Sequence, residues 1–320
     1  FVFIISFGYT FKAFEIFDIW FQSQIKSKYS VYSRFLAFFV ISVCKILFIL
    51  IKAPLIYFVY VFAVENIITS ILLFIFYLKV SNVSIFKWKI KTNTILNLLK
   101  DSWPLILSGI SVTIYHKIDQ IMIGDMLGDS KLGFYSAAVK ISEIWYFIPM
   151  IVTNSVFPSI LNAKKKDWGL YLNRFQILYN SFTWFTIAVS IIISIFSPVI
   201  INLIYGKEYF EASIVLSLHI WASIFVFLGV ASSKYLIAEN LTTISFIRTF
   251  LGAISNIVLN IFLIPLMGIN GAALATLLSY FISNYFILIT KKGRVAGLAM
   301  IKSFNIFYVI KEIKNNGKTF

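Results

Sequence analysis

Charge and the residues of catalytic and metal sites are scarce in this sequence of 320 residues. Asp, Glu, Lys and Arg make up 13% of it, against about 25% in an average soluble domain. Cysteine occurs once, as Cys44, and histidine twice, as His116 and His219. A single cysteine excludes a disulfide framework within the chain, and these three residues lack the spacing of a zinc site.

The sequence also has little material for an enzyme. It contains no Gly-x-x-x-x-Gly-Lys-Ser/Thr loop, which excludes ATP hydrolysis of the P-loop type. No nucleophilic serine motif stands out. A membrane glycosyltransferase typically needs a large outer loop with acidic residues, whereas the loops expected on that side are short. The sequence therefore predicts a protein that is not an enzyme.

Apolar residues dominate instead. They make up 60% of the chain, and the mean hydropathy is +0.89, a composition typical of an all-α protein that crosses a membrane several times. The net charge is +15. Because the basic residues gather on loops between apolar segments, we expect them to lie at the surface of a lipid bilayer, and we expect no nucleic-acid partner.

Hydropathy predicts about nine membrane-spanning helices, most of them near the roughly 20 residues that cross a bilayer. They cover residues 1–11, 32–51, 54–78, 103–125, 134–157, 173–196, 209–238, 243–265 and 268–290. The chain begins within an apolar run and without methionine, so we expect an N-terminal part of the protein to be missing. Pro149 lies inside a predicted span and should kink its helix.

Lys and Arg are distributed unequally between alternate loops. Loops of one parity carry basic clusters, in residues 26–34, 79–100, 164–174 and 291–318, whereas the opposite loops carry Lys52, Lys131 and Lys207. Cytoplasmic loops hold the excess of positive charge in membrane proteins. The sequence therefore predicts a cytoplasmic C-terminus.

The turn between the last two predicted spans has a physical signature of its own. Pro265 and Gly268 mark the turn, and the small residues Gly271, Ala272 and Ala273 follow directly. In lipid, packing drives the association of helices, and small residues let two backbones approach closely. We expect the two spans to form a tightly packed pair.

Six segments along the chain together resemble one family. They are 14–23 (FEIFDIWFQS), 103–109 (WPLILSG), 117–124 (KIDQIMIG), 133–140 (GFYSAAVK), 256–260 (NIVLN) and 264–276 (IPLMGINGAALAT). The set resembles bacterial flippases of lipid-linked oligosaccharides, the O-antigen or capsular polysaccharide type within the multidrug/oligosaccharidyl-lipid/polysaccharide exporter superfamily. The resemblance follows the order of the family's segments over nearly the whole chain.

This resemblance implies a two-lobed helical bundle of the MATE-like exporter type. It assigns 1–102 to the C-terminal part of the first lobe plus a cytoplasmic linker, 103–290 to a second lobe of six helices and 291–320 to a basic cytoplasmic tail. The implied activity is the translocation of undecaprenyl-pyrophosphate-linked O-antigen or capsule repeat units from the cytoplasmic to the periplasmic leaflet, by alternating access. The implied location is the bacterial inner membrane, with polysaccharide polymerase machinery as a further partner.

A cation-coupled multidrug or metabolite antiporter of the related MATE family is the alternative. It would carry small cations and have an acidic cavity. Within the predicted spans, basic residues outnumber acidic ones: Lys12, Lys45, Lys117, Lys140, Lys234 and Arg248 against Glu65, Asp119 and Glu143. This excess favours an anionic substrate.

Charged residues inside spans are costly and usually face a cavity or a partner. The candidates for cavity lining or gating are Lys45, Glu65, Lys117, Asp119, Lys140 and Glu143. Depth along the helices brings Asp119 level with Lys140, Lys117 level with Glu143, and Lys45 near Glu65. Structural ion pairs between neighbouring helices are the alternative, and both roles can coexist. We expect His116 and His219 to be polar packing residues.

Three basic residues lie within about two turns of the cytoplasmic ends of their helices: Arg174, Lys234 and Arg248. Snorkelling to the lipid headgroups is one interpretation. Attraction of a substrate pyrophosphate is the other, because Arg offers bidentate contacts to phosphate. No resident cofactor is expected, and coupling to H+ or Na+ through Glu65, Asp119 or Glu143 stays open, as do the glycan and the oligomeric state.

Overall fold

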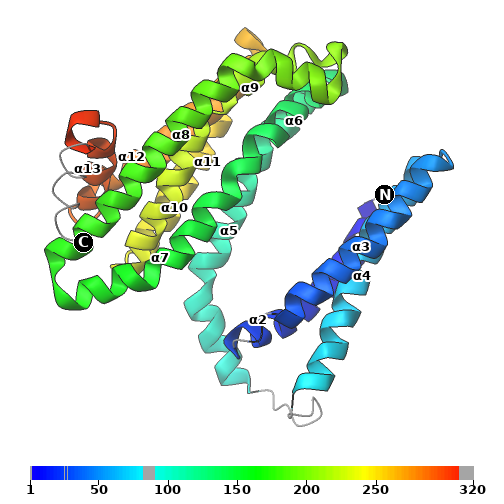
Figure 1. The fold of residues 1–320 in the computed structure, drawn as a ribbon, viewed down its shortest axis with the longest axis horizontal. Coiled ribbons are helices and arrows are strands. Elements are labelled where there is room, and N and C mark those ends of the chain that lie inside the picture. Colours follow the sequence, from blue (N-terminus) through cyan, green and yellow to red (C-terminus); the bar gives the residue numbers. More distant parts are fainter. Residues whose placement is uncertain (1, 25, 27, 82–90, 310–320) are drawn as a thin grey trace. The chain divides into compact units, whose positions relative to one another are not determined.

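The computed structural model of this chain describes residues 2–24, 26, 28–81 and 91–309. All regular secondary structure in these residues is helical, which confirms the predicted all-α class. The chain forms two compact units, Phe1–Thr92 and Asn93–Phe320, which are described separately below (Figure 1). The predicted lobe boundaries remain predictions.

Seven helical segments in the described residues are long and apolar enough to cross a membrane: Lys28–Leu50, Leu55–Val80, Asp129–Lys166, Trp168–Tyr205, Ala212–Ala238, Thr242–Met267 and Ile269–Ile289. Each overlaps a predicted span. The predicted spans 1–11 and 103–125 fall instead in α1 (Val2–Thr10) and α5 (Thr92–Leu127), which are not among the seven. The chain is a multi-pass membrane protein, and the count of nine spans remains a prediction.

The first unit is built around α4 (Leu55–Val80), which packs against α1, α2 (Glu15–Ser23) and α3 (Lys28–Leu50). A short 3-10 turn, η1 (Phe11–Phe14), joins α1 to α2. A largely aromatic cluster in the core of the first unit consists of Phe17, Phe21, Leu73 and Tyr77. Close packing of aromatic rings and apolar side chains thus holds these helices together.

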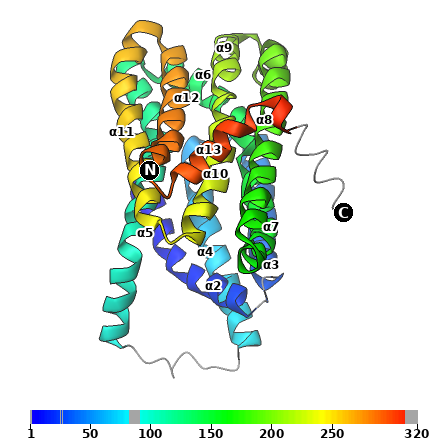
Figure 2. The ribbon, with the colours of Figure 1, turned by 90° about the vertical axis from the view of Figure 1, so that its left-hand side faces the viewer.

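The second unit contains the remaining helices (Figures 1 and 2). They are α5, α6 (Asp129–Glu143), α7 (Phe147–Lys166), α8 (Trp168–Tyr205), α9 (Ala212–His219), α10 (Ala222–Ala238), α11 (Thr242–Met267), α12 (Ile269–Tyr285) and α13 (Arg294–Ser303), with 3-10 turns η3 (Ile144–Tyr146), η4 (Lys207–Tyr209) and η5 (Phe286–Ile289). The long helix α8 packs against α7, α9, α10 and α13. It is therefore the central support of this unit.

The helix α13 lies inside the segment that the sequence assigns to a basic tail. Ala296 and Met300 are buried in the core that α8 and α10 also build. A hydrogen bond of 2.7 Å joins the Ser303 hydroxyl on α13 to the Thr183 hydroxyl on α8. Residues 294–303 are therefore part of the folded unit, because the small or apolar side chains on one face of α13 pack against α8. The rest of the predicted basic tail, residues 310–320, lies outside the described residues.

The α-helix is interrupted just before Pro149, the residue at which the sequence predicts a kink. The segment Asp129–Lys166 is interrupted by η3, which ends three residues before Pro149 and contains Trp145, the residue four positions earlier. A proline ring clashes with the carbonyl four residues before it and donates no hydrogen bond. Because α7 begins at Phe147, Pro149 lies in its first turn, where the missing N–H has no intrahelical acceptor to lose.

The turn between α11 and α12 shows the close packing expected from its small residues, and Figure 2 shows the two helices side by side. Gly268 has a φ of +59° and a ψ of −140°, a conformation that side chains with a Cβ rarely adopt. A Cβ on Gly271 would lie 2.0 Å from the carbonyl oxygen of Leu263 on α11. Ala272 and Ala273 are fully buried. The prediction of a tightly packed pair is confirmed.

We expect Gly271→Ala to lower the free energy of unfolding by about 1–3 kcal/mol, because the added methyl group overlaps backbone that has little room to move. Thermal unfolding of the purified full-length protein in detergent measures this change. The matched control is Gly109→Ala, since a Cβ at Gly109 meets nothing within 4 Å. Equal melting temperatures for the two variants would contradict the assignment of close packing to Gly271.

Candidate functional site

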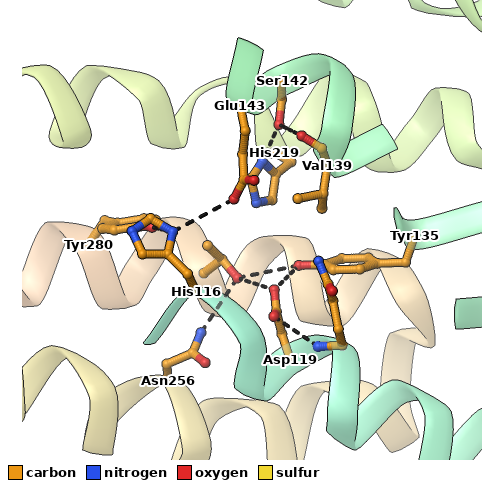
Figure 3. A network of polar contacts seen from close by, with 11 residues as sticks. His116, Asp119, Tyr135, Val139, Ser142, Glu143, His219, Asn256 and Tyr280 are labelled. Carbon is orange, nitrogen blue, oxygen red and sulfur yellow. Dashed lines mark hydrogen bonds and ion pairs between the residues drawn. The ribbon is translucent and has the colours of Figure 1, made fainter. Parts of the chain in front are cut away.

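A buried carboxylate occupies the centre of the second unit. Asp119 on α5 is 3% exposed. It accepts hydrogen bonds from the hydroxyl of Tyr135 on α6, from the backbone N–H of Gln120 at 2.8 Å and from the hydroxyl of Thr276 on α12 at 3.3 Å (Figure 3). A carboxylate in a medium of low dielectric is costly unless such donors surround it. These bonds therefore fix three helices around one charge.

The network continues onto α11. The side-chain Nδ2 of Asn256 donates to the Thr276 hydroxyl at 3.4 Å, and the side-chain Nδ2 of Asn260 donates to Oδ1 of Asn256 at 3.1 Å. Both asparagines are fully buried. The side-chain oxygen of Asn260 is buried and accepts no hydrogen bond from the described residues. The network thus ends on an oxygen with an unused lone pair.

Four of the six segments that carry the family resemblance meet in this network. Segments 117–124, 133–140, 256–260 and 264–276 supply Asp119, Tyr135, the two asparagines and Thr276 respectively. Of these residues, only Asp119 is a site residue predicted from the sequence. The spacing of two asparagines four residues apart in an apolar helix places them on one face, and this signal could have identified them.

A second polar group lies beside the first, between α5, α6, α9 and α12 (Figure 3). The Nδ1 atom of His116 lies 3.1 Å from the Tyr280 hydroxyl and 3.6 Å from a carboxylate oxygen of Glu143. The Ser142 hydroxyl and Nδ1 of His219 form a hydrogen bond of 2.6 Å. His219 is a buried polar packing residue, as predicted. His116 is partly exposed and contacts a charged residue in addition.

The predicted pair of Lys45 and Glu65 is present in the first unit. The Nζ atom of Lys45 on α3 lies 3.5 Å from a carboxylate oxygen of Glu65 on α4, and both side chains are partly exposed. The geometric prediction of an ion pair between these antiparallel helices is confirmed. Its proposed role as a gate remains a prediction.

The other two predicted pairings, Asp119 with Lys140 and Lys117 with Glu143, are not ion pairs among the described residues, although Lys117 acts electrostatically on Glu143. Lys117 and Lys140 are exposed, and neither forms an ion pair with another described residue. Asp119 is held by hydroxyl groups, and Glu143 faces His116. Residue number gives the depth of a side chain along its helix, but packing decides the direction in which it points around the axis. The roles of these residues in a cavity or gate remain predictions.

Arg248 points into the bundle. Its side chain is 5% exposed, and the guanidinium donates to the hydroxyls of Ser232 and Ser233, both at 2.6 Å, and to the carbonyl oxygen of Gly229 at 2.9 Å. All three acceptors belong to α10. Arg248 therefore does not snorkel towards headgroups.

A cavity of about 160 Å³ lies next to Arg248, within the second unit. Its polar lining residues are His116, Ser233, Arg248, Thr249, Tyr280, Ser283 and Asn284. The side-chain oxygen of Asn284 is buried and accepts no hydrogen bond from the described residues. The cavity therefore combines a fixed positive charge with several neutral hydrogen-bonding groups.

The other two basic candidates both contact α7. Arg174 on α8 is half-buried and donates from Nη1 to the carbonyl oxygen of Ser159 at 2.8 Å and to its hydroxyl. Lys234 on α10 donates to the amide oxygen of Asn154 at 2.7 Å and lies 5.3 Å from the ring centre of Phe157. The three predicted pyrophosphate residues thus have different surroundings.

Comparison with known proteins gives one family and two relatives. The family described as polysaccharide biosynthesis protein matches residues 2–214. The probable low-salt glycan biosynthesis flippase of Haloferax volcanii is 28% identical over 182 residues, and a second probable flippase of that organism is 29% identical over 170 residues. These matches cover 56% and 52% of this chain but 38% and 35% of the relatives.

Among solved structures, the lipid II flippase MurJ in an inward closed conformation superposes with a TM-score of 0.68. The superposition covers 98% of this chain and 68% of that protein, at 19% sequence identity. A likeness at this identity shows a shared fold.

We expect Tyr135→Phe to lower the free energy of unfolding by about 1–3 kcal/mol, because it leaves the buried Asp119 carboxylate short of one donor. Tyr179→Phe is the matched control. Tyr179 is also fully buried in the second unit, but its hydroxyl has no hydrogen-bond partner among the described residues. Chemical unfolding of both variants measures the difference, and an equal loss in both would show that the bond to Asp119 is unimportant.

Proposed function

The chain belongs to the polysaccharide biosynthesis protein family, and from this membership we propose that the full-length protein is a flippase for a lipid-linked glycan precursor. The family match over residues 2–214 carries the proposal. The helical fold shared with MurJ supports it, as do the two relatives whose names describe flippases. In this proposal the protein is a transporter and not an enzyme.

The proposed substrate is an undecaprenyl-pyrophosphate-linked O-antigen or capsule repeat unit, moved from the cytoplasmic to the periplasmic leaflet. Two MATE-like lobes with about nine spans in this chain would alternate in access, in a bacterial inner membrane and with the C-terminus in the cytoplasm. The segments that resemble O-antigen flippases and the unequal distribution of Lys and Arg between loops support this finer proposal. Polysaccharide polymerase machinery is its proposed partner.

Exposed cations in the spans suit an anionic substrate. Lys117 and Lys140 are exposed and have no ion-pair partner among the described residues. We propose that they attract the glycan-linked pyrophosphate, while Lys45–Glu65 and His116–Glu143 act as contacts that open and close. Arg248, held rigidly beside a polar cavity, is the proposed phosphate contact deeper in the unit.

Complementation tests the function. The full-length gene is expressed in cells that lack their own flippase, and surface polysaccharide is measured. We expect the wild-type protein to restore it and the double variant Lys117→Gln/Lys140→Gln to lower it at least about tenfold, since a hydrogen bond to a charged group contributes about 1.5–3 kcal/mol.

The control for this experiment is Lys291→Gln/Lys292→Gln, which removes the same charge from two exposed residues after η5. It should retain transport. Increased drug tolerance without surface polysaccharide would instead support the cation-coupled antiporter of the MATE family. Full transport by Lys117→Gln/Lys140→Gln would remove these residues from substrate recognition.

We further propose that transport is coupled to a cation, H+ or Na+, through Asp119. The carboxylate is buried, so a proton or a cation changes its energy more than at an exposed site. The Asp119 and Thr276 oxygens and the unsatisfied Asn260 oxygen belong to one network, and hard cations prefer oxygen ligands. Because four helices contribute to this network, a change of charge there would reach all of them.

For this coupling role we expect Asp119→Asn to lower transport at least about tenfold, because each 1.36 kcal/mol of lost stabilisation of the transporting state is tenfold in rate. Asp129→Asn, at an exposed residue in the first turn of α6, should leave transport unchanged. Removal of external sodium and collapse of the proton gradient, tested separately on the wild type, distinguish the two cations. If transport by Asp119→Asn depends on the sodium or proton gradient as strongly as transport by the wild type, Asp119 has no role in the coupling.

A further inference from the structure

A groove between α7 and α8 has no role in the functions discussed above. Its volume is about 700 Å³, within the range of about 300–1,000 Å³ that small-molecule sites occupy. The apolar lining residues are Val152, Val156, Ile160, Leu170, Ile177 and Leu178. Polar atoms come from Ser159, Asn173, Arg174 and Ser181. The groove is thus largely apolar and contains one positively charged side chain, Arg174.

That charge is positioned but not neutralised. Nη1 of Arg174 donates to the carbonyl oxygen and the hydroxyl of Ser159. Among the described residues no acceptor bonds to its Nη2 or Nε, and no carboxylate lies within ion-pair distance. A guanidinium held at one edge and open at the other offers a fork of donors to a phosphate.

The turn between α7 and α8 adds features of a headgroup region. Lys165 and Lys166 end α7 and are exposed, and Trp168, 48% exposed, begins α8. Basic residues and tryptophan gather where a helix leaves the hydrocarbon core. Arg174 lies six residues into α8, about 9 Å from this end. Lys164 differs from its neighbours, because it pairs with Glu239 at 2.8 Å.

We propose that this groove binds an anionic phospholipid of the surrounding bilayer. The phosphate lies at Arg174, and an acyl chain follows the apolar walls from Ile160 and Ile177 towards Val152. Lys165 and Lys166 complement the negative headgroup at the membrane surface. A phospholipid supplies both a phosphate for the guanidinium and an acyl chain for the apolar walls, so the combination of walls and charge favours a lipid.

Binding of fluorescent phosphatidylglycerol to the purified full-length protein tests the site. Arg174→Gln should weaken binding about fivefold, the effect of one basic residue at a membrane surface. Arg294→Gln is the matched control, because Arg294 is an exposed arginine whose Nε donates to the backbone carbonyl of Leu288 at 3.2 Å. It should leave the affinity unchanged, and phosphatidylcholine should bind wild type and Arg174→Gln equally.

A second variant tests the groove apart from the charge. Ser181→Trp places a large side chain at an exposed position of the lining and leaves Arg174 intact. It should also weaken phosphatidylglycerol binding, at an unchanged melting temperature. Equal weakening by Arg174→Gln and Arg294→Gln would show general surface attraction and overturn the proposal. Farnesyl pyrophosphate serves as a competitor. If only a large excess of it displaces phosphatidylglycerol, the phospholipid proposal is supported. If equimolar farnesyl pyrophosphate displaces phosphatidylglycerol, the groove belongs to an isoprenyl pyrophosphate and the proposal is overturned.

Discussion

The second unit is organised around the need to satisfy one buried carboxylate. Asp119 is buried away from water, so hydrogen-bond donors from neighbouring helices must offset the desolvation free energy of its carboxylate. Tyr135 and Thr276 donate hydrogen bonds to the carboxylate directly, and the asparagines of α11 extend the network behind Thr276. The positions of α5, α6, α11 and α12 are therefore coupled, because a shift of any of them changes the bonding of a buried charge.

Close packing makes this coupling possible. Thr276 reaches Asp119 from α12 while Asn256 reaches Thr276 from α11, so these two helices must run near each other. The absence of a side chain at Gly271 lets α12 approach the Leu263 carbonyl, and the alanines that follow keep the surfaces close. Polar bonding and small-residue packing are thus two parts of one arrangement, in which neither helix can move without cost to both.

Basic side chains of the second unit occupy three different environments. Arg248 is buried and bound to α10, Arg174 is half-buried at the edge of an apolar groove, and Lys117 and Lys140 are exposed. The environment decides which anion each can meet. A buried guanidinium can contact a group that enters the polar cavity, a groove-edge guanidinium suits a lipid phosphate, and exposed ammonium groups act over a distance on whatever approaches.

The sequence alone determined the all-α membrane class, the approximate positions of seven spans and the close α11–α12 turn, because hydropathy and small side chains act locally. It also placed Asp119, Lys45 and Glu65 among the charges that need partners. Tertiary structure decided the partners of Asp119, the burial of Arg248 and the packing of α13 on α8. Each of these depends on the rotation of a helix about its axis, which side-chain packing between distant segments sets and residue spacing does not.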